Sequence, residues 1–176
     1  MNKNPELSEM IRVNHAGEFG AKQIYAGQIK IFGHKKQQDM VDEFTHMKDQ
    51  EDIHFEYFDQ KIKDQQIRPT IMQPLWKVGG FALGAITAMM GKKAAMTCTM
   101  AVEEVIDEHY QSQLTYLDQH EDHVELSHKI EQFRQEELEH KNTGAGHGAE
   151  DYFLHKPLMK IIKNISKAAI MISKKI

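Results

Sequence analysis

The sequence predicts an all-α protein built around a four-helix bundle. Its 176 residues contain only four prolines (Pro5, Pro69, Pro74 and Pro157), which leaves long stretches free to form helices. Apolar residues recur at spacings of three and four, and little of the chain alternates with the period of a β-strand. A chain of this length with 40% hydrophobic residues can bury one continuous core. We therefore expect a single domain over residues 1–176.

Two long helices are predicted in the first half of the chain. The first covers about residues 8–32 and ends at Gly33, a residue type that often terminates helices. The second covers about residues 37–65, and a connection through residues 68–74 follows it. In both, apolar residues recur along one face, as expected of helices that pack that face against a core.

The second half repeats this arrangement and adds two shorter segments. Helices are predicted at about residues 91–118 and 123–143, and the glycines at 144–148 stop the latter. An apolar, glycine-containing run at 78–90 precedes the pair. An amphipathic C-terminal helix at 157–176 follows it, with isoleucines on one side and lysines on the other.

The pattern Glu-x-x-His occurs four times, and helical phase separates the four copies. At about 100° per residue, two copies continue the apolar face of their helices: Glu51/His54 and Glu137/His140. The other two lie roughly 80° and 120° away from that face and are expected to be solvated: Glu43/His46 and Glu125/His128.

A lone glutamate lies on the apolar face of each remaining helix, Glu18 in the first and Glu103 in the third. The neighbouring acid Glu104 falls on the polar face, as does Glu136 in the fourth helix. The lone inward glutamate precedes the inward Glu-x-x-His by 33 residues in the first half (18 to 51) and by 34 in the second (103 to 137). The chain therefore contains two similar helical hairpins that we expect to face each other.

Six inward residues together predict a dinuclear metal site, and we assign them as both metal-binding and catalytic: Glu18, Glu51, His54, Glu103, Glu137 and His140. One Glu from each of two helices plus Glu-x-x-His from each of two others is the ligand set of ferritin-like carboxylate proteins. Four buried carboxylates without partners would be prohibitively unstable, and two divalent cations would neutralise them. A single buried Glu or His is more often an ion-paired core residue. The repeated set favours iron or manganese, which suit oxygen and nitrogen ligands.

Four other residues have weaker assignments. His15 lies on the inward face of the first helix, where a satisfied core or helix-end histidine is the simpler interpretation. Tyr25 and Tyr110 could donate hydrogen bonds to a ligand or substrate, with ordinary packing as the alternative. Cys98, the only cysteine, excludes a disulfide framework or a zinc site of several thiolates, fits a reducing compartment, and is expected to be inert and buried.

Charge and hydropathy bear on partners. The formal net charge of -4 combines six lysines in residues 156–176 with a remainder of 16 basic and 26 acidic residues. An acidic main body argues against nucleic-acid binding.

The uncharged stretch between Lys77 and Lys92 has 14 residues, short of the roughly 20 that span a bilayer. It is either a buried helix or an interfacial patch that admits an apolar ligand. The lysine-faced tail favours membrane contact, and its alternative is a helix packed across the bundle.

Two absences complete the interpretation. The N-terminal residues lack the pattern of a secretory signal or a transit peptide, which favours a cytosolic start. No G-x-G-x-x-G follows a predicted strand, so a built-in dinucleotide site is not expected, and electrons would come from the substrate, from diffusing NADH or from a partner.

Several blocks of the sequence closely resemble the demethoxyubiquinone hydroxylase family (2-polyprenyl-3-methyl-6-methoxy-1,4-benzoquinone monooxygenases): IRVNHAGEFG at 11–20, IYAGQ at 24–28, RPT at 68–70, PLW at 74–76, GFALG at 80–84, VEE at 102–104 and EELEH at 136–140. The resemblance covers nearly the whole chain from residue 11. It implies a ferritin-like fold with two Fe ions per chain. Glu18 and Glu103 would be terminal carboxylates and Glu51 and Glu137 bridging ones, with one histidine per iron.

The resemblance also implies an activity and a location. The expected reaction is hydroxylation of a polyprenylated benzoquinone or quinol ring with O2 and an electron donor, NADH or quinol, in ubiquinone biosynthesis. Peripheral attachment to the cytoplasmic side of a bacterial inner membrane is expected, with the matrix side of the mitochondrial inner membrane as the alternative. Other ubiquinone-biosynthesis proteins are possible partners.

Three rival functions use parts of the same sequence. A ferritin-like iron store, or another di-iron oxidase, would use the same ligands, but a store would need cage contacts rather than a lysine-faced tail. A rubrerythrin-type peroxidase would need a Cys-x-x-Cys iron domain, which one cysteine cannot supply. A metal-free membrane-bound scaffold is the third.

Overall fold

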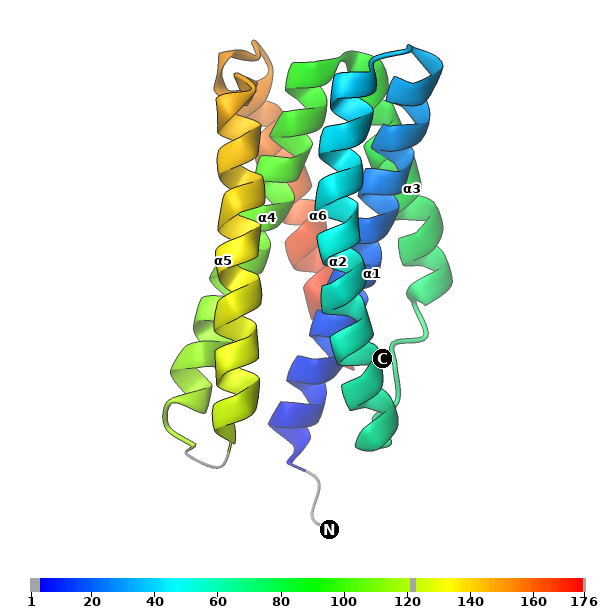
Figure 1. Cartoon of the computed structure of the whole chain (residues 1–176). Helices are drawn as coiled ribbons and strands as arrows, with labels where there is room; N and C mark the ends of the chain where they lie inside the picture. The colour runs from blue at the N-terminus through cyan, green and yellow to red at the C-terminus, as the bar shows by residue number, and fades with distance from the viewer. Residues whose placement is uncertain (1–3, 121–122, 176) are drawn as a thin grey trace.

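A computed structural model describes residues 4–120 and 123–175, and these form α-helices and no β-strand. The six α-helices are α1 (Pro5–His34), α2 (Gln38–Asp64), α3 (Gln73–Met90), α4 (Lys92–Leu117), α5 (Val124–Gly146) and α6 (His155–Lys175), with a short 3-10 helix, η2 (Ala149–Asp151), before α6. The predicted all-α class with a four-helix bundle is confirmed, with α1, α2, α4 and α5 as the bundle (Figure 1). Residues 1–3, 121, 122 and 176 of the expected domain lie outside the described residues, and the single domain stays a prediction.

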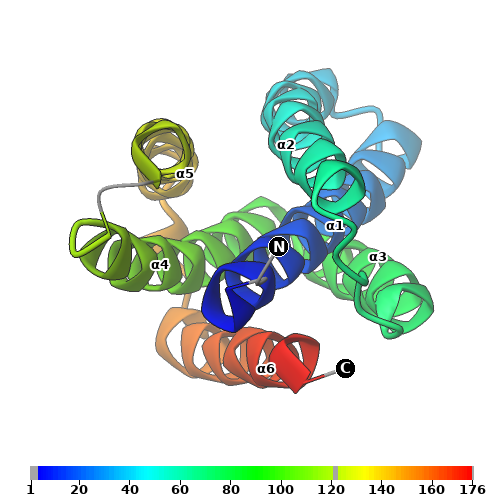
Figure 2. The ribbon, with the colours of Figure 1, turned by 90° about the horizontal axis from the view of Figure 1, so that it is seen from below.

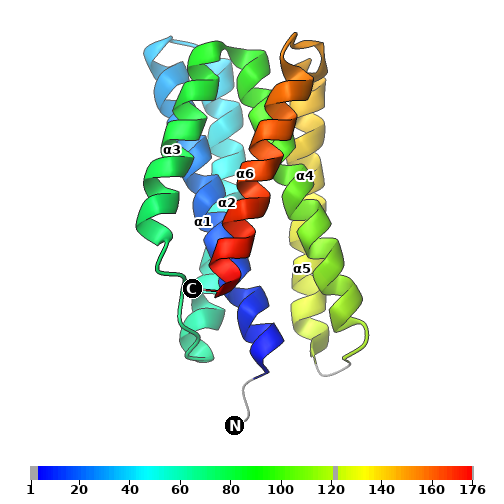
Figure 3. The same ribbon diagram turned by 180° about the vertical axis from the view of Figure 1, so that it is seen from behind.

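The helices are arranged in three layers. Figure 2 shows α1 and α4 in the middle, α2 and α5 on one side of them, and α3 and α6 on the other. Helix α3 packs along α1, and α6 packs across α4 and α1. Seen from behind, α3 and α6 therefore cover one face of the bundle (Figure 3).

Three helix ends, two of α1 and one of α5, differ from the prediction. Helix α1 begins earlier because the side chain of Asn4 accepts hydrogen bonds from the first backbone amides and Pro5 suits the first helical turn. It also continues through Gly33, and Lys36, with φ 55°, adopts the left-handed conformation after its end. Helix α5 likewise runs on to Gly146, and the positive φ of 73° falls at Gly148.

Helices α1 and α3 approach closely because glycines remove side chains from their contact. A Cβ atom on Gly84 would lie 1.9 Å from the backbone oxygen of Ile24, and one on Gly27 would lie 2.3 Å from the backbone oxygen of Phe81. Any larger residue at these positions would force the two backbones apart. The apolar run predicted at 78–90 is thus held against the bundle by glycine contacts.

Helix α3 is nevertheless exposed on its outer side, so of the two alternatives for residues 78–90, the ordinary buried helix does not fit. Its outward apolar side chains are exposed: Leu75, Val78, Phe81, Ile86, Met89 and Met90. Helix α6 also exposes Ile161, Ile165 and Met171. No helix among residues 4–120 and 123–175 is long and apolar enough to cross a membrane.

Three lysines of α6 form ion pairs with acidic residues of the bundle. Lys163 lies 2.7 Å from Glu104, Lys167 lies 2.7 Å from Glu108, and Lys174 lies 3.5 Å from Glu9. These ion pairs attach α6 to α4 and α1, as expected for the alternative of a terminal helix packed across the bundle.

Two apolar clusters fill the bundle along its length. One contains Ile11, Phe58, Tyr110, Ile130 and Phe133, and the other contains Phe32, Phe44, Met47, Met96 and Met100. On α1, α2 and α4, the inward Glu or Glu-x-x-His lies between residues of these two clusters, and on α5 it follows Ile130 and Phe133 of the first cluster. The polar residues are therefore enclosed by apolar packing at both ends.

Candidate metal centre

The structure brings the six predicted residues together at the centre of the bundle. Each is at most 2% exposed, and they come from all four bundle helices: Glu18, Glu51, His54, Glu103, Glu137 and His140. Their orientation follows the helical phase, because Glu103 faces inward while Glu104 contacts Lys163 of α6. Packing of the apolar faces of the two hairpins thus brings together residues that are far apart in the sequence.

The cluster divides into two overlapping groups of possible ligands. Glu18, Glu51, His54 and Glu137 form one group, and Glu51, Glu103, Glu137 and His140 form the other. Within each group, one ligand atom from every residue lies within 4.8 Å of the others. Glu51 and Glu137 belong to both groups, so the geometry can accommodate two ions that share two carboxylates.

The hydrogen bonding of the cluster is incomplete in a way that fits bound cations. Buried atoms without a hydrogen-bond partner include Oε2 of Glu18, both oxygens of Glu51, Oε2 of Glu103, Oε1 of Glu137 and Nδ1 of His54. Buried polar groups are normally paired, because leaving them unpaired costs free energy. These atoms converge on one region, so the donor set fits metal ions.

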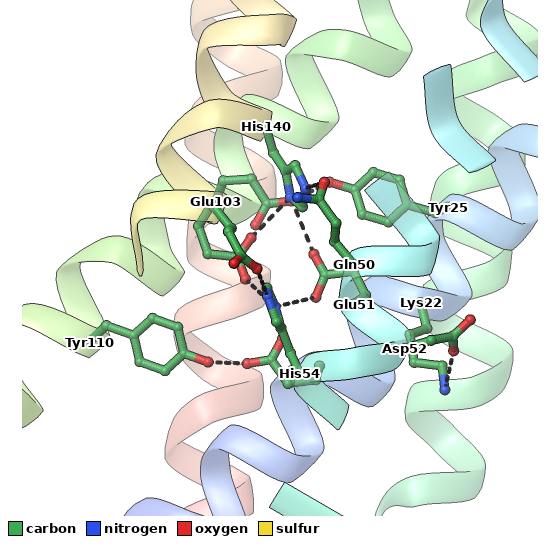
Figure 4. Close-up of polar contacts among 12 residues, drawn as sticks. Lys22, Tyr25, Gln50, Glu51, Asp52, His54, Glu103, Tyr110 and His140 are labelled. Carbon is green, nitrogen blue, oxygen red and sulfur yellow. Dashed lines mark hydrogen bonds and ion pairs between the residues drawn. The ribbon is translucent and has the colours of Figure 1, made fainter. Parts of the chain in front are cut away.

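Both histidines present the same ring nitrogen to the cluster. Nδ1 of His54 lies 3.1 Å from Glu137, and Nδ1 of His140 lies 3.1 Å from the other oxygen of the same carboxylate. Nε2 points away from the cluster in each case and meets a side chain from the opposite helix. For His54, Nε2 lies 2.6 Å from Glu136. For His140, it lies 2.9 Å from Gln50 (Figure 4).

Two tyrosines hydrogen-bond to the outer carboxylates in a reciprocal arrangement. Tyr25 of α1 donates to Glu103 of α4 at 2.5 Å, and Tyr110 of α4 donates to Glu18 of α1. Figure 4 shows the two phenols approaching the cluster from opposite sides. Each tyrosine lies seven residues after the glutamate of its own helix (18 to 25 and 103 to 110). The hydrogen-bonding role considered from the sequence is therefore present.

Among the side chains of the cluster, the electrostatics favour protons on Glu18, Glu103 and His140. Burial raises the pKa of Glu18 and Glu103 well above its ordinary value, and the neighbouring carboxylates raise it further. Burial acts in the same direction on Glu51, but the nearby imidazoles of His140 and His54, at 3.4 and 3.5 Å, outweigh it and lower its pKa. Burial lowers the pKa of His140, whereas its carboxylate partners prevail and raise the pKa to about 11. Metal ions would have to displace these protons.

The residues given weaker or solvated assignments lie outside the cluster. His15 lies 3.4 Å from Asp59 and packs on Phe55, outside the cluster, and its Nε2 has no hydrogen-bond partner, so a satisfied core histidine stays a prediction. Glu43 lies near His147, and Glu125 is exposed and pairs with Lys61. Cys98 is buried, and burial raises the pKa of its thiol to about 12, consistent with an inert residue.

Sequence reasoning missed two residues that contact the cluster histidines. The prediction that Glu136 points to solvent with the polar face is wrong, because its side chain crosses to His54 of α2. Gln50 was not singled out. The signal that could have found both is their position, since each directly precedes the inward glutamate of its Glu-x-x-His (50 before 51 and 136 before 137).

An apolar cavity of about 360 Å³ lies beside the cluster, between α1, α3, α4 and α6. Glu18 and Tyr110 contribute to its wall, so it reaches the cluster. Its wall also includes Asn14 and His109. Gln113 donates to Asn14 at 2.7 Å and its amide nitrogen lies 2.7 Å from His109, whose pKa is lowered by burial to about 4. The cavity therefore combines apolar walls with a small polar region of neutral groups.

Comparison with known proteins identifies similar chains. The model of the family described as ubiquinone biosynthesis protein COQ7 matches residues 5–173. A Dictyostelium discoideum protein named NADPH-dependent 3-demethoxyubiquinone 3-hydroxylase, mitochondrial, is 44% identical over 99% of this chain and 79% of its own. A Rhodospirillum rubrum protein named 3-demethoxyubiquinol 3-hydroxylase is 42% identical over 97% and 78%. A Saccharomyces cerevisiae protein named 5-demethoxyubiquinone hydroxylase, mitochondrial, is 37% identical over 97% and 78%.

Proposed function

The chain belongs to the family described as ubiquinone biosynthesis protein COQ7, and from this premise we propose that it hydroxylates the ring of demethoxyubiquinone or its quinol. It is an oxidoreductase of ubiquinone biosynthesis. The reaction replaces a ring hydrogen by a hydroxyl group, and it consumes O2, two electrons and two protons, with water as the second product. The observation that carries the proposal is the buried cluster of four carboxylates and two imidazoles in two overlapping groups.

The six cluster residues are the proposed ligands of two iron ions. Glu51 and Glu137 would bridge the ions, since both belong to the two groups, while Glu18 and Glu103 would be terminal. His54 and His140 would each bind one ion through Nδ1, the nitrogen that faces the carboxylates. Four carboxylates balance the charge of two divalent ions. When bound, the iron would supply the redox chemistry that activates O2.

The surrounding residues hold these ligands and keep water out. Tyr25 and Tyr110 fix one oxygen of each terminal carboxylate, which limits its rotation. Burial raises the pKa of both phenols well above the ordinary value, so they remain hydrogen-bond donors. The apolar clusters at both ends of the site exclude water from the reacting atoms.

The apolar cavity is the proposed binding site for the quinone ring. Its walls from α3 and α6 include Leu75 and Ile165, which are about half exposed, so apolar side chains continue from the cavity to the surface. A polyprenyl chain could follow this path. The polar region near Asn14 and His109 could meet the ring oxygens and hold the reacting carbon near the ligands, which is a proximity effect.

The exposed apolar side chains of α3 and α6 support peripheral membrane contact, because large exposed apolar patches mark interaction surfaces. We propose the cytoplasmic side of a bacterial inner membrane, or the matrix side of the mitochondrial inner membrane, since the relatives include bacterial and mitochondrial proteins. A reduced nicotinamide is the proposed electron donor, because the name of the Dictyostelium relative specifies NADPH. The relatives' names do not favour the rival function of iron storage.

The test uses the purified chain loaded anaerobically with Fe2+ and then given NADPH, ¹⁸O2 and a short-chain demethoxyubiquinol. The expected product contains one added ¹⁸O atom by mass spectrometry. Glu137→Ala should abolish product formation, and Glu104→Ala should preserve it because that residue lies outside the cluster. An unlabelled product, or equal activity in both variants, would contradict the proposal.

A further inference from the structure

The two hairpins place the same ligands around the centre, but they differ in what supports the histidines. Nε2 of His54 on α2 contacts Glu136 of α5, and Nε2 of His140 on α5 contacts Gln50 of α2. Glu136 and Gln50 occupy equivalent positions, each directly before the inward glutamate of its own helix. The equivalent contact is therefore made by a carboxylate in one case and by a neutral amide in the other.

The remaining contacts of the two groups match. Each group contains the shared Glu51 and Glu137, one terminal carboxylate and one histidine. Each terminal carboxylate accepts a hydrogen bond from a tyrosine of the facing helix. The two halves therefore differ in the residue that contacts Nε2 of the histidine, which is Glu136 for His54 and Gln50 for His140.

The difference affects how strongly each imidazole donates electrons through Nδ1. An N–H donated to a carboxylate gives a charge-assisted hydrogen bond and makes the opposite ring nitrogen more basic. Glu136 is also only partly exposed, with 24% of its side chain accessible, so water screens its charge incompletely. The amide oxygen of Gln50 accepts the same type of hydrogen bond without a full negative charge.

We propose that Glu136 and Gln50 make the two metal sites unequal, so that the ion bound by His54 is held more tightly and is more easily oxidised than the ion bound by His140. Both are positioning residues that act through the histidines. The inference rests on the proposed dinuclear metal site and adds an order of filling and of oxidation to it.

The test is an anaerobic calorimetric titration of the iron-free protein with Fe2+. The wild-type protein should show two binding steps of different affinity. Glu136→Gln keeps an acceptor oxygen for His54 but removes the charge, and it should weaken the tighter step by about 10–100-fold. Gln50→Glu should strengthen the weaker step instead, a gain that a merely structural role would not produce. Glu139→Gln, an exposed position on the same helix, should change neither step.

A spectroscopic measurement provides a second readout. With ⁵⁷Fe2+, the Mössbauer spectrum of the wild-type protein should contain two distinct quadrupole doublets, and those of Glu136→Gln should be more alike. The inference is wrong if Glu136→Gln behaves like Glu139→Gln, or if it and Gln50→Glu act on the same step. Equal sites in an active enzyme would contradict this inference alone, whereas a folded wild-type protein that binds no Fe2+ would contradict the proposed function as well.

Discussion

Removing single carboxylates should change the iron content in steps that depend on how many metal groups each residue serves. Glu137 belongs to both groups, and Glu103 belongs only to the group that contains His140. Glu137→Ala removes the shared ligand and should leave almost no tightly bound iron. Glu103→Ala leaves Glu18, Glu51, His54 and Glu137 in place, so it should retain one of the two ions.

The assay is metal analysis of each variant after anaerobic loading with Fe2+ and removal of loosely bound metal. Glu104→Ala is the matched control, because it removes the adjacent acid of the same helix. That variant loses a partly exposed ion pair with Lys163, which contributes on the order of 1 kcal/mol to stability, and it should keep both ions. Circular dichroism should show that every variant is folded. Equal iron loss from Glu103→Ala and Glu104→Ala would refute the assigned orientation, and full occupancy in Glu137→Ala would refute the shared ligand.

Three further predictions concern pH, packing and membranes. Because burial raises the pKa of Glu18 and Glu103, protons compete with metal ions for these carboxylates. The affinity for Fe2+ should therefore fall as the pH is lowered. A pH-independent affinity would contradict this prediction. In urea, Gly84→Ala should lower the free energy of unfolding by about 1–3 kcal/mol, because the added Cβ clashes with α1. Gly79→Ala has open space around the added Cβ and should raise that free energy by about 0.5–1 kcal/mol. Equal effects of the two substitutions would argue against the close contact of α1 and α3. Val78→Asp replaces an exposed apolar side chain of α3 by a charged one, and it should weaken vesicle binding roughly tenfold at unchanged iron content. Unchanged vesicle binding would show that Val78 does not contact the membrane.

Much of the fold follows from local properties of the sequence. The phase of an α-helix is fixed at about 100° per residue, so the apolar face could be traced and the inward acids separated from their neighbours. Glu103 and Glu104 are adjacent in the sequence, yet one is 1% exposed and the other contacts α6. The repeat of the two hairpins then predicted that the inward residues meet.

Other features depend on tertiary contacts that helical phase does not reveal. Glu136 starts on a polar face, but its long side chain reaches His54 because α2 lies opposite α5. The cavity exists only because α3 and α6 cover α1 and α4, and its wall combines residues distant in the sequence. The end of α1 is set by the residues after Gly33, since Lys36 adopts the left-handed conformation that glycine was expected to supply.

The most direct test of the dinuclear assignment is the low-temperature Mössbauer spectrum of the ⁵⁷Fe-loaded wild-type protein after oxidation. Two ferric ions that share Glu51 and Glu137 should couple through the bridging groups and give a diamagnetic ground state, with quadrupole doublets and no magnetic splitting in a weak field. The iron content should be about two ions per chain. A magnetically split spectrum of isolated ferric ions, or a folded protein that retains no iron, would contradict the account.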